Sequence, residues 1–396
     1  MSQKLKYFQD IIFPEEEYRM RLKKTRELMN KKNIDCLIIS DDRMTWYFTG
    51  FGTITPIGSR ARPRILIIPF MEEPIFYVHQ STVNCVKEMV WFDRVVGYSD
   101  ITQAPIEMIA STIKEICGSE KRVGFELGQD QRLGFSVRDF LHLRDSLKDF
   151  EFIDSADLLL RLRMVKSEQE VKRIRRACEI TSLTYDYAFP KIQAGMTERE
   201  IGTLMERTMN SYGAMGTWVY VLTSDYQRID GVLRNKKSKK GDLVYIDMGA
   251  NFGGYWADFS RAGVLGSPSA EQERMQNLTN EVCIIGVEAC RIGRTMSQVA
   301  NIVEKALVNR GLIDNKRNIF SSHASRYGHG IGIFTTEPPN FSLYDHTVIE
   351  KNMVLTMEPG IIKKDGYFHI EEDFLITETG TEVLSTSKQE LIHIYV

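Results

Sequence analysis

Two regions in the second half of the 396-residue chain combine apolar strand patterns with acidic residues. The first joins Leu-Val-Tyr-Ile-Asp-Met-Gly at 243–249 to Tyr-Trp-Ala-Asp-Phe-Ser-Arg at 255–261, with Asn-Phe-Gly-Gly at 251–254 as turn material. A hairpin closing at this turn is expected to set Asp247 opposite Asp258, about 5 Å apart on neighbouring strands. Because a carboxylate among apolar residues is costly to bury without a partner, the pattern predicts a cation between the two acids.

The same pattern recurs near the C-terminus. Apolar segments that carry Glu358 and Glu371 are joined across Lys-Lys-Asp-Gly at 363–366. Between the two regions, Tyr-Gly-His-Gly-Ile-Gly at 327–332 surrounds His329 with glycines that allow close backbone approach. Four ionised carboxylates and a neutral histidine carry about four negative charges, which two divalent cations would balance. Oxygen-rich ligation with one nitrogen favours Mn, Fe, Co or Zn ions over a thiol-liganded structural zinc.

Composition narrows the class of protein. A chain of 396 residues suits two domains. Its 51 Lys and Arg nearly balance 53 Asp and Glu, so the net charge of the chain does not favour binding to nucleic acid or anionic lipid. No apolar run resembles a signal peptide or approaches the roughly 18 residues of a membrane span. The six cysteines include no CxxC pair. We therefore expect a soluble, cytoplasmic enzyme with reduced thiols and with no nucleic-acid or membrane partner.

Alternating strand and helix patterns in the first half predict a layered α/β domain. Apolar strands are expected at 35–40, 64–69 and 73–78, followed by further helices and strands. A charged helical stretch then begins at residue 156, and within it Ser167 and Glu170 have the spacing of a capping box. We place the domain boundary here, with one domain at 1–158 and a second, α+β domain of long helices and hairpins at 159–396.

At these motifs the sequence resembles the pita-bread metallohydrolases, a family that includes methionine aminopeptidase, aminopeptidase P, prolidase and the metal-free creatinase. The similarity to the aminopeptidase P and prolidase branch covers nearly the whole chain. The matching segments are Leu-Arg-Met-Val-Lys-Ser at 162–167, Gly-Asp-Leu-Val-Tyr-Ile-Asp at 241–247, Gly-His-Gly-Ile-Gly at 328–332, Met-Glu-Pro-Gly at 357–360 and Ile-Glu at 370–371. The resemblance implies an N-terminal creatinase-like α/β domain followed by a C-terminal pita-bread, methionine aminopeptidase-like catalytic domain.

The resemblance also implies roles for the five candidate ligands. Asp258 and Glu371 would bridge two divalent ions, Asp247 would chelate one of them, and His329 with Glu358 would complete the other. A hydroxide bridging the two metals would attack an amide carbonyl, with Glu358 passing the proton of the water to the leaving nitrogen. The implied reaction is hydrolysis of a Xaa-Pro bond in a substrate of dipeptide size, with Glu358 and His329 as catalytic residues. Five intact ligands argue against a non-catalytic binding module.

Three positions near these ligands depart from the peptidase pattern. Where peptidases of the family carry histidines, this chain has Thr336 and Asp230, and His369 replaces an arginine. Thr336 can donate a hydrogen bond but cannot transfer protons near pH 7. Asp230 either binds a cationic group of the substrate or pairs with Arg228. His369 either carries a proton or hydrogen-bonds a ligand carboxylate.

These departures leave a second function open. A creatinase-like or ectoine-hydrolase-like hydrolase, or a lyase, acting on a small zwitterion would tolerate the loss of the usual histidines. His323, six residues before His329, is a further candidate for the cleft. Arg60 and Arg62 either clamp a substrate carboxylate or form a solvated basic edge. In creatinase-like relatives the equivalent region of one subunit reaches the partner's active site, so a homodimer is expected.

Overall fold

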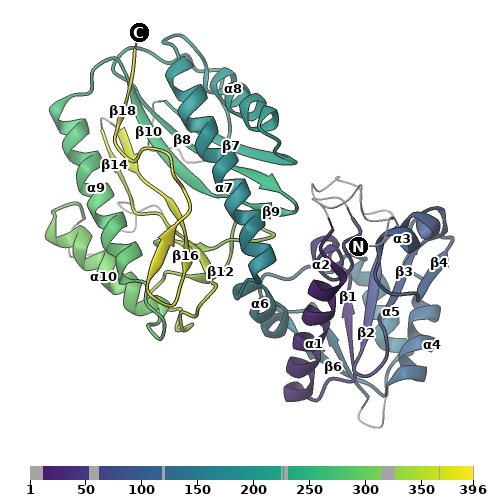
Figure 1. Cartoon of the computed structure of the whole chain (residues 1–396). Helices are drawn as coiled ribbons and strands as arrows, with labels where there is room; N and C mark the ends of the chain where they lie inside the picture. Colours follow the sequence, from purple (N-terminus) through teal and green to yellow (C-terminus); the bar gives the residue numbers. More distant parts are fainter. Residues whose placement is uncertain are drawn as a thin grey trace. The chain divides into compact units, whose positions relative to one another are not determined.

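The computed structural model describes residues 12–52, 62–117, 121–223, 226, 231–313, 326–364 and 366–395. The chain forms two compact units, Met1–Arg163 and Met164–Val396 (Figure 1). The boundary predicted between residues 158 and 159 falls inside helix α6 (Ala156–Met164), and as a domain boundary it stays a prediction. Among the described residues, no helix has the length and apolar character needed to span a membrane.

The first unit is built on a six-stranded sheet with the strand order β4-β3-β2-β1-β5-β6. Its strands are β1 (Cys36–Ile39), β2 (Ile65–Pro69), β3 (Ile75–His79), β4 (Val95–Tyr98), β5 (Arg122–Phe125) and β6 (Glu151–Asp154). The sheet is mixed, because β1 runs antiparallel to β2 and parallel to β5. The strands predicted at 35–40, 64–69 and 73–78 are confirmed as β1, β2 and β3.

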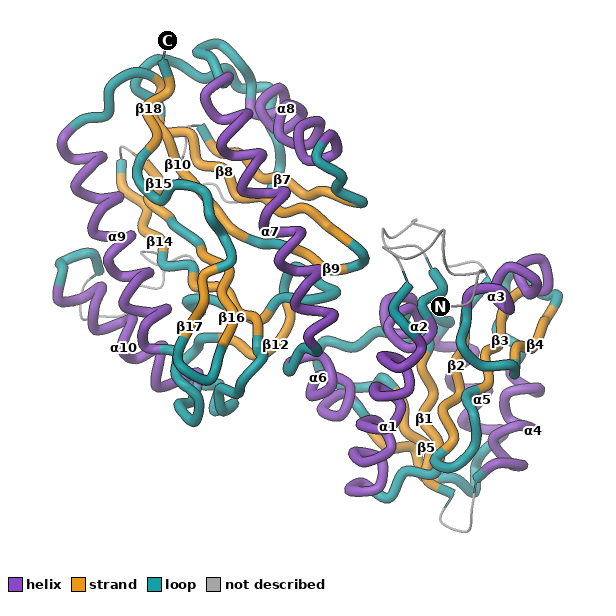
Figure 2. The backbone as a smooth tube through the Cα atoms, viewed as in Figure 1, coloured by secondary structure: helices purple, strands orange, loops and turns teal. Residues whose placement is uncertain are grey.

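Helices surround this sheet and complete an α/β unit (Figure 2). They are α1 (Glu15–Lys32), α2 (Asp42–Thr49), the 3-10 helix η2 (Gln80–Thr82), α3 (Val83–Met89), α4 (Ile106–Ile116), α5 (Val137–Ser146) and α6. Ile109 and Ile113 of α4 and Leu143 of α5 join Ile38 and Val123 of the sheet in one buried apolar cluster. Burial of this face, at about 25 cal/mol per Å² of apolar surface, stabilises the layered arrangement that the alternating pattern predicts.

In the described part of the second unit, the strands form two sheets and a two-stranded ribbon. One sheet has the order β18-β10-β8-β7, with β9 paired to β8, and the other has the order β12-β11-β13-β16-β17; β14 and β15 form the ribbon. The strands are β7 (Gly216–Leu222), β8 (Leu243–Phe252), β9 (Tyr255–Trp256), β10 (Phe259–Leu265), β11 (His329–Gly330), β12 (Glu337–Asn340), β13 (Val354–Met357), β14 (Gly360–Lys363), β15 (Gly366–His369), β16 (Glu372–Ile376), β17 (Thr381–Val383) and β18 (Ile392–Ile394).

The helices of this unit flank the strands, with α7 and α8 on one side and α9 and α10 on the other (Figure 1). They are α7 (Glu168–Ala188), the 3-10 helix η3 (Phe189–Lys191), α8 (Glu198–Ser211), α9 (Ala270–Ala289) and α10 (Met296–Asn309). The capping boxes that begin α7 at Ser167 and α8 at Thr197 are both present. Ser269 and Thr295 begin α9 and α10 in the same way. Each box satisfies backbone N–H groups that the helix itself leaves unpaired.

The register of the first acidic hairpin differs from the one predicted. Its turn is closed by two residues, Gly253 and Gly254, which have φ of 56° and 89°. Such a two-residue turn matches the twist of the strands, and it pairs Asp247 with Ser260. The expectation that Asp247 directly opposes Asp258 was therefore wrong, because it assumed a four-residue turn over 251–254.

Three of the four candidate acids lie where strands are interrupted. Asp258 stands between β9 and β10, Glu358 between β13 and β14, and Glu371 between β15 and β16. At each break the chain leaves one ladder and enters another, since β13 pairs with β16 while β14 pairs with β15. The residues at these breaks are released from the strict alternation of side chains in a strand. Their carboxyl groups can therefore be turned toward a common point.

A substitution of Gly328 tests whether the backbone next to His329 must pass close to the backbone of Thr356. It has φ +149°, and a Cβ atom there would lie 2.2 Å from the carbonyl oxygen of Thr356. We predict that Gly328→Ala lowers the free energy of unfolding by about 2–4 kcal/mol, from strain and overpacking together. Gly213→Ala is the matched control, because Gly213 also has positive φ but no atom within 4 Å of the added Cβ. Urea unfolding measures both variants, and equal losses would contradict the packing argument.

Candidate metal centre

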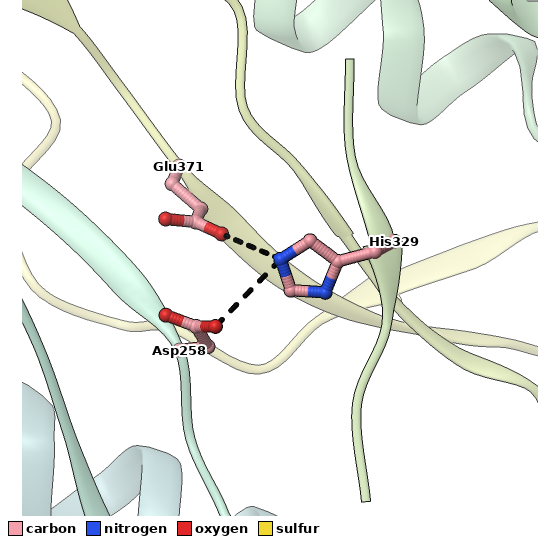
Figure 3. A group of neighbouring side chains, drawn as sticks. All are labelled: Asp258, His329 and Glu371. Carbon is pink, nitrogen blue, oxygen red and sulfur yellow. Dashed lines mark ion pairs between the residues drawn. The ribbon is translucent and has the colours of Figure 1, made fainter. Parts of the chain in front are cut away.

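Asp258, His329 and Glu371 form a compact buried group in the second unit (Figure 3). One possible ligand atom from each residue lies within 4.8 Å of the others. The His329 Nε2 atom is 3.7 Å from Asp258 Oδ2 and 3.9 Å from Glu371 Oε1. The three side chains come from β11 and from the strand breaks that precede β10 and β16. This is a possible buried metal site.

The other two predicted ligands adjoin this group. Glu358 Oε1 lies 3.7 Å from His329 Nε2. Asp247, on β8, is close enough to Glu358 for the negative charge of Glu358 to raise its pKa. The structure thus brings together all five side chains that the sequence singles out, although they are spread over more than a hundred residues of the chain.

Burial disfavours the ionised forms of all four acids, and repulsion between carboxylates adds to this effect for Asp247, Asp258 and Glu371. Burial raises the pKa of Asp247 to about 7, and repulsion from Glu358 adds to the rise. Burial also raises the pKa of Glu358 to about 7, against the opposing effect of Arg326. The pKa values of Asp258 and Glu371 rise well above the ordinary range, through burial first and repulsion by neighbouring carboxylates second. Positive charge close to the four carboxyl groups is needed to keep all of them ionised.

His329 is held as a neutral imidazole. Burial and, second to it, the positive charge of Arg326 lower its pKa to about 3. Nδ1 lies 3.0 Å from the carbonyl oxygen of Gly330. Donation of the Nδ1 hydrogen to this oxygen leaves the lone pair of Nε2 facing the acids. A lone pair directed at carboxylates is repulsive unless a cation lies between them, and this tautomer is the one that metal-binding histidines use.

The oxygen atoms of the group support the same interpretation. Asp247 Oδ1, Glu358 Oε1 and both carboxylate oxygens of Glu371 are buried and accept no hydrogen bond within the described part of the chain. Buried oxygens without donors are rare, because each one costs about 1–3 kcal/mol. Hard oxygen donors together with one neutral imidazole are a donor set that divalent cations accept. The residues present therefore fit a divalent metal.

Two crossed hydrogen bonds connect the chain segments around Asp258 and Glu371. Asp373 Oδ2 accepts a 2.9 Å hydrogen bond from the backbone N–H of Asp258. In the opposite direction, Arg261 Nη1 donates to the carbonyl oxygen of Glu371 at 2.9 Å. Asp373 Oδ2 also accepts from the Cys178 thiol at 3.3 Å. These side chains fix the backbone on which Asp258 and Glu371 are presented.

Comparison with known proteins gives the family. Residues 172–378 match Metallopeptidase family M24, and residues 21–165 match the Creatinase/Prolidase N-terminal domain. The chain belongs to metallopeptidase family M24. A Xaa-Pro dipeptidase from Pyrococcus horikoshii is 30% identical over 376 residues, which cover 94% of this chain and 98% of the relative.

Solved structures agree with this assignment. The prolidase from Pyrococcus horikoshii OT3 has a TM-score of 0.80 at 28% identity, covering 94% of this chain and 100% of that one. An X-Pro aminopeptidase from Thermotoga maritima MSB8 has a TM-score of 0.79 at 25% identity, covering 94% and 99%. The predicted fold is confirmed as a creatinase-type α/β domain followed by a pita-bread domain. The protein is a hydrolase similar to Xaa-Pro peptidases.

The remaining predicted residues of this M24 member have different surroundings. His369 is buried, with Nδ1 2.7 Å from Ser260 Oγ and Nε2 3.9 Å from Glu358 Oε2, so it lies beside a candidate ligand. Thr336 is exposed on the loop before β12, and Arg62 is exposed in the first unit. The other three candidates, Asp230, His323 and Arg60, lie outside the described residues.

Sequence reasoning missed two residues that the structure places at the centre. Arg326 Nε lies 3.4 Å from Glu358 Oε1, and Asp373 holds the backbone of Asp258. Both stand close to a candidate ligand in sequence, three residues before His329 and two after Glu371. A charged residue close to a candidate ligand was the available sequence signal. It was not sufficient, because the partners of Arg326 and Asp373 lie in distant segments of the chain.

The raised acid pKa values predict how the metal-free protein responds to pH. The folded-state pKa values of Asp247 and Glu358 are about 7, above their ordinary values of 3.8 and 4.5. Their contribution to stability is therefore present at low pH and is lost as pH rises through about 7. We expect the Tm of chelator-treated protein to fall between about pH 5 and pH 8, and added Mn²⁺ to suppress the fall. Calorimetry at both pH values tests this, and the same fall with and without metal would contradict it.

Asp373 offers a test of the crossed hydrogen bonds. Asp373→Ala removes the acceptor for the Asp258 N–H, and we expect divalent-metal affinity to weaken about 10- to 100-fold. Asp373→Asn keeps the side-chain volume and one acceptor oxygen, so it should lose less. Metal titration by calorimetry measures both variants, with the exposed Asp186→Ala as the control. Unchanged affinity in a folded Asp373→Ala protein would remove the positioning role.

Proposed function

We propose that this M24 protein is a two-metal peptidase that hydrolyses the Xaa-Pro bond of a substrate of dipeptide size. The observation that carries the proposal is the buried group of Asp258, His329 and Glu371. Beside it, four buried oxygens of Asp247, Glu358 and Glu371 have no hydrogen-bond donor among the described residues. The kinship with Xaa-Pro dipeptidases supports the choice of substrate. In this proposal Asp247, Asp258, His329, Glu358 and Glu371 would hold the two ions.

The metal ions and the side chains would have separate tasks. Two divalent ions, of Mn, Fe, Co or Zn, would act as Lewis acids that polarise the scissile carbonyl and make water nucleophilic near neutral pH. Glu358 is the ligand best placed for proton transfer, because its side chain is 16% exposed while those of Glu371 and His329 are 1% and 3% exposed. It would accept a proton from water and deliver it to the leaving nitrogen. His369, beside Glu358 Oε2, would orient that carboxylate.

A second function rests on the positions that depart from peptidases. Thr336 stands exposed on the loop before β12, where a peptidase of this branch is expected to carry a proton-transferring histidine. A creatinase-like or ectoine-hydrolase-like hydrolase, or a lyase, acting on a small zwitterion would not need that histidine. For this reason we expect Xaa-Pro turnover to be well below that of a typical prolidase.

Two further properties belong to the proposal. We infer a homodimer, as in creatinase-like enzymes, and a cytoplasmic location. All six cysteines are free thiols, which supports a reducing compartment. Substrates are expected to be small molecules or dipeptides, with manganese among the candidate metals.

Removal of a bridging ligand tests the proposed function. We expect the purified protein to carry close to two divalent ions per chain and to release proline from Xaa-Pro dipeptides. Asp258→Ala should lose both ions and lower kcat by at least about 10³-fold, because each ion depends on this carboxylate. Elemental analysis and a proline-release assay measure the two effects, with Asp186→Ala as the control. Metal-independent turnover, or full metal content in Asp258→Ala, would overturn the assignment.

A further inference from the structure

Two cysteines of the first unit lie in direct contact. Cys36 is the first residue of β1, and Cys117 is the residue that follows α4. Their Sγ atoms are 3.3 Å apart, so that one thiol donates a hydrogen bond to the other. The two residues are separated by 81 positions in the sequence, and the fold alone brings them together.

The other four cysteines, all of them described, have partners of a different kind. The thiols of Cys178, Cys283 and Cys290 donate to oxygen atoms, and the thiol of Cys85 lies 4.0 Å from Met89 Sδ. A hydrogen bond between two thiols is weak, because sulfur is a poor donor and a poor acceptor. The contact of Cys36 with Cys117 is therefore of interest for its chemistry more than for its contribution to stability.

The two thiols differ in their access to solvent. Cys36 is fully buried in the sheet, where it pairs with Pro69 of β2 and Val123 of β5. Cys117 is partly exposed and packs against the same apolar cluster. The hydrogen bond with Cys117, and burial second to it, raise the pKa of the Cys36 thiol well above its ordinary value. A reagent in solution therefore meets Cys117 first, and Cys36 can react only after it.

Little movement is needed to join the two sulfurs. A disulfide bond is about 2.05 Å long, so the Sγ atoms would approach by roughly 1.3 Å. Cys36 is fixed in the central ladder of the sheet. Cys117 lies beyond Ile116, the last residue of α4, and belongs to no strand. Its side chain can supply the approach without disturbing the sheet.

We propose that Cys36 and Cys117 form a redox-active pair, which takes a low-molecular-weight disulfide as its oxidant and closes to a reversible intramolecular disulfide. In the first step the Cys117 sulfur attacks one sulfur of the oxidant, whose S–S bond breaks, and one thiolate leaves. In the second step the Cys36 sulfur attacks the Cys117 sulfur, and the second thiolate leaves. The two cysteines lose two electrons and the oxidant gains them, while the two thiol protons pass to the released thiolates.

The disulfide would link the centre of the sheet to the end of α4. Cys36 and Ile113, in the last turn of α4, already share one buried cluster, so the link reinforces packing that is present in the reduced protein. Because the linked residues are 81 positions apart, the link also restricts a long segment of the unfolded chain. Oxidation would therefore stabilise the first unit. Both cysteines belong to that unit, so the pair is independent of the proposed function.

Peptide mapping of the full-length, metal-loaded protein tests the pair. The protein is incubated with glutathione disulfide, its remaining thiols are blocked with iodoacetamide, and its peptides are separated without reductant. Wild type should yield a linked peptide of Cys36 and Cys117 that disappears after treatment with dithiothreitol. Cys36→Ala should leave glutathione attached to Cys117, because the second step lacks its attacking sulfur. Cys117→Ser should yield neither the link nor an adduct on Cys36.

The exposed Cys85 is the internal control, because it contacts no thiol that could displace glutathione. It should carry glutathione in all three proteins, and Cys85→Ser should keep the link. Cys117 is partly exposed, so Cys117→Ser tests the pair even if Cys36→Ala fails to fold. A wild type that carries glutathione on Cys117 without forming the link would overturn the proposal. An unmodified Cys117 beside a modified Cys85 would overturn it as well.

Calorimetry measures the consequence of the link. The Tm of oxidised wild type should lie about 5–15 °C above that of the reduced protein. Cys117→Ser should show no difference between the two treatments. An equal Tm in fully linked and reduced wild type would overturn the stabilising effect.

Discussion

The catalytic unit depends on the burial of four carboxyl groups and one neutral imidazole around a common point. Without a cation, burial raises the pKa values of all four acids, and repulsion between carboxylates adds to the rise for Asp247, Asp258 and Glu371. Burial and the positive charge of Arg326 lower the pKa of His329. Such an arrangement opposes folding unless positive charge compensates it. The acids lie on or between strands of different sheets, and the packing of these strands away from the centre holds the acids together.

Interrupted strands are the means by which the fold directs these side chains. Continuous pairing would alternate side chains between two faces, whereas breaks before β10, β14 and β16 release Asp258, Glu358 and Glu371 from that alternation. The crossed hydrogen bonds of Asp373 and Arg261 then restore rigidity at two of these breaks. Glu358, whose side chain is 16% exposed, would transfer the proton in the proposed reaction. The strand breaks therefore position three of the five candidate ligands.

Much of this arrangement was predictable from the sequence, because its signals are local. An acid within an apolar strand, glycines around a histidine and Ser or Thr three residues before Glu are readable without tertiary information. The register of the first hairpin was predicted wrongly, since the sequence Asn-Phe-Gly-Gly allows turns of different length and Gly253 with Gly254 form the shorter one. Arg326 and Asp373 were missed because their importance comes from partners distant in the chain, Glu358 and Asp258. Asp230, His323 and Arg60 lie outside the described residues, and their roles stay predictions.

The most direct test of the central claim is anomalous diffraction from crystals of the protein loaded with Mn²⁺. Two anomalous peaks about 3.5–4 Å apart are expected, both contacted by Asp258 and Glu371, as in other two-metal sites. His329 Nε2 should contact one peak and Asp247 the other. No peak among these five side chains at saturating metal, or peaks elsewhere in the chain, would contradict the account.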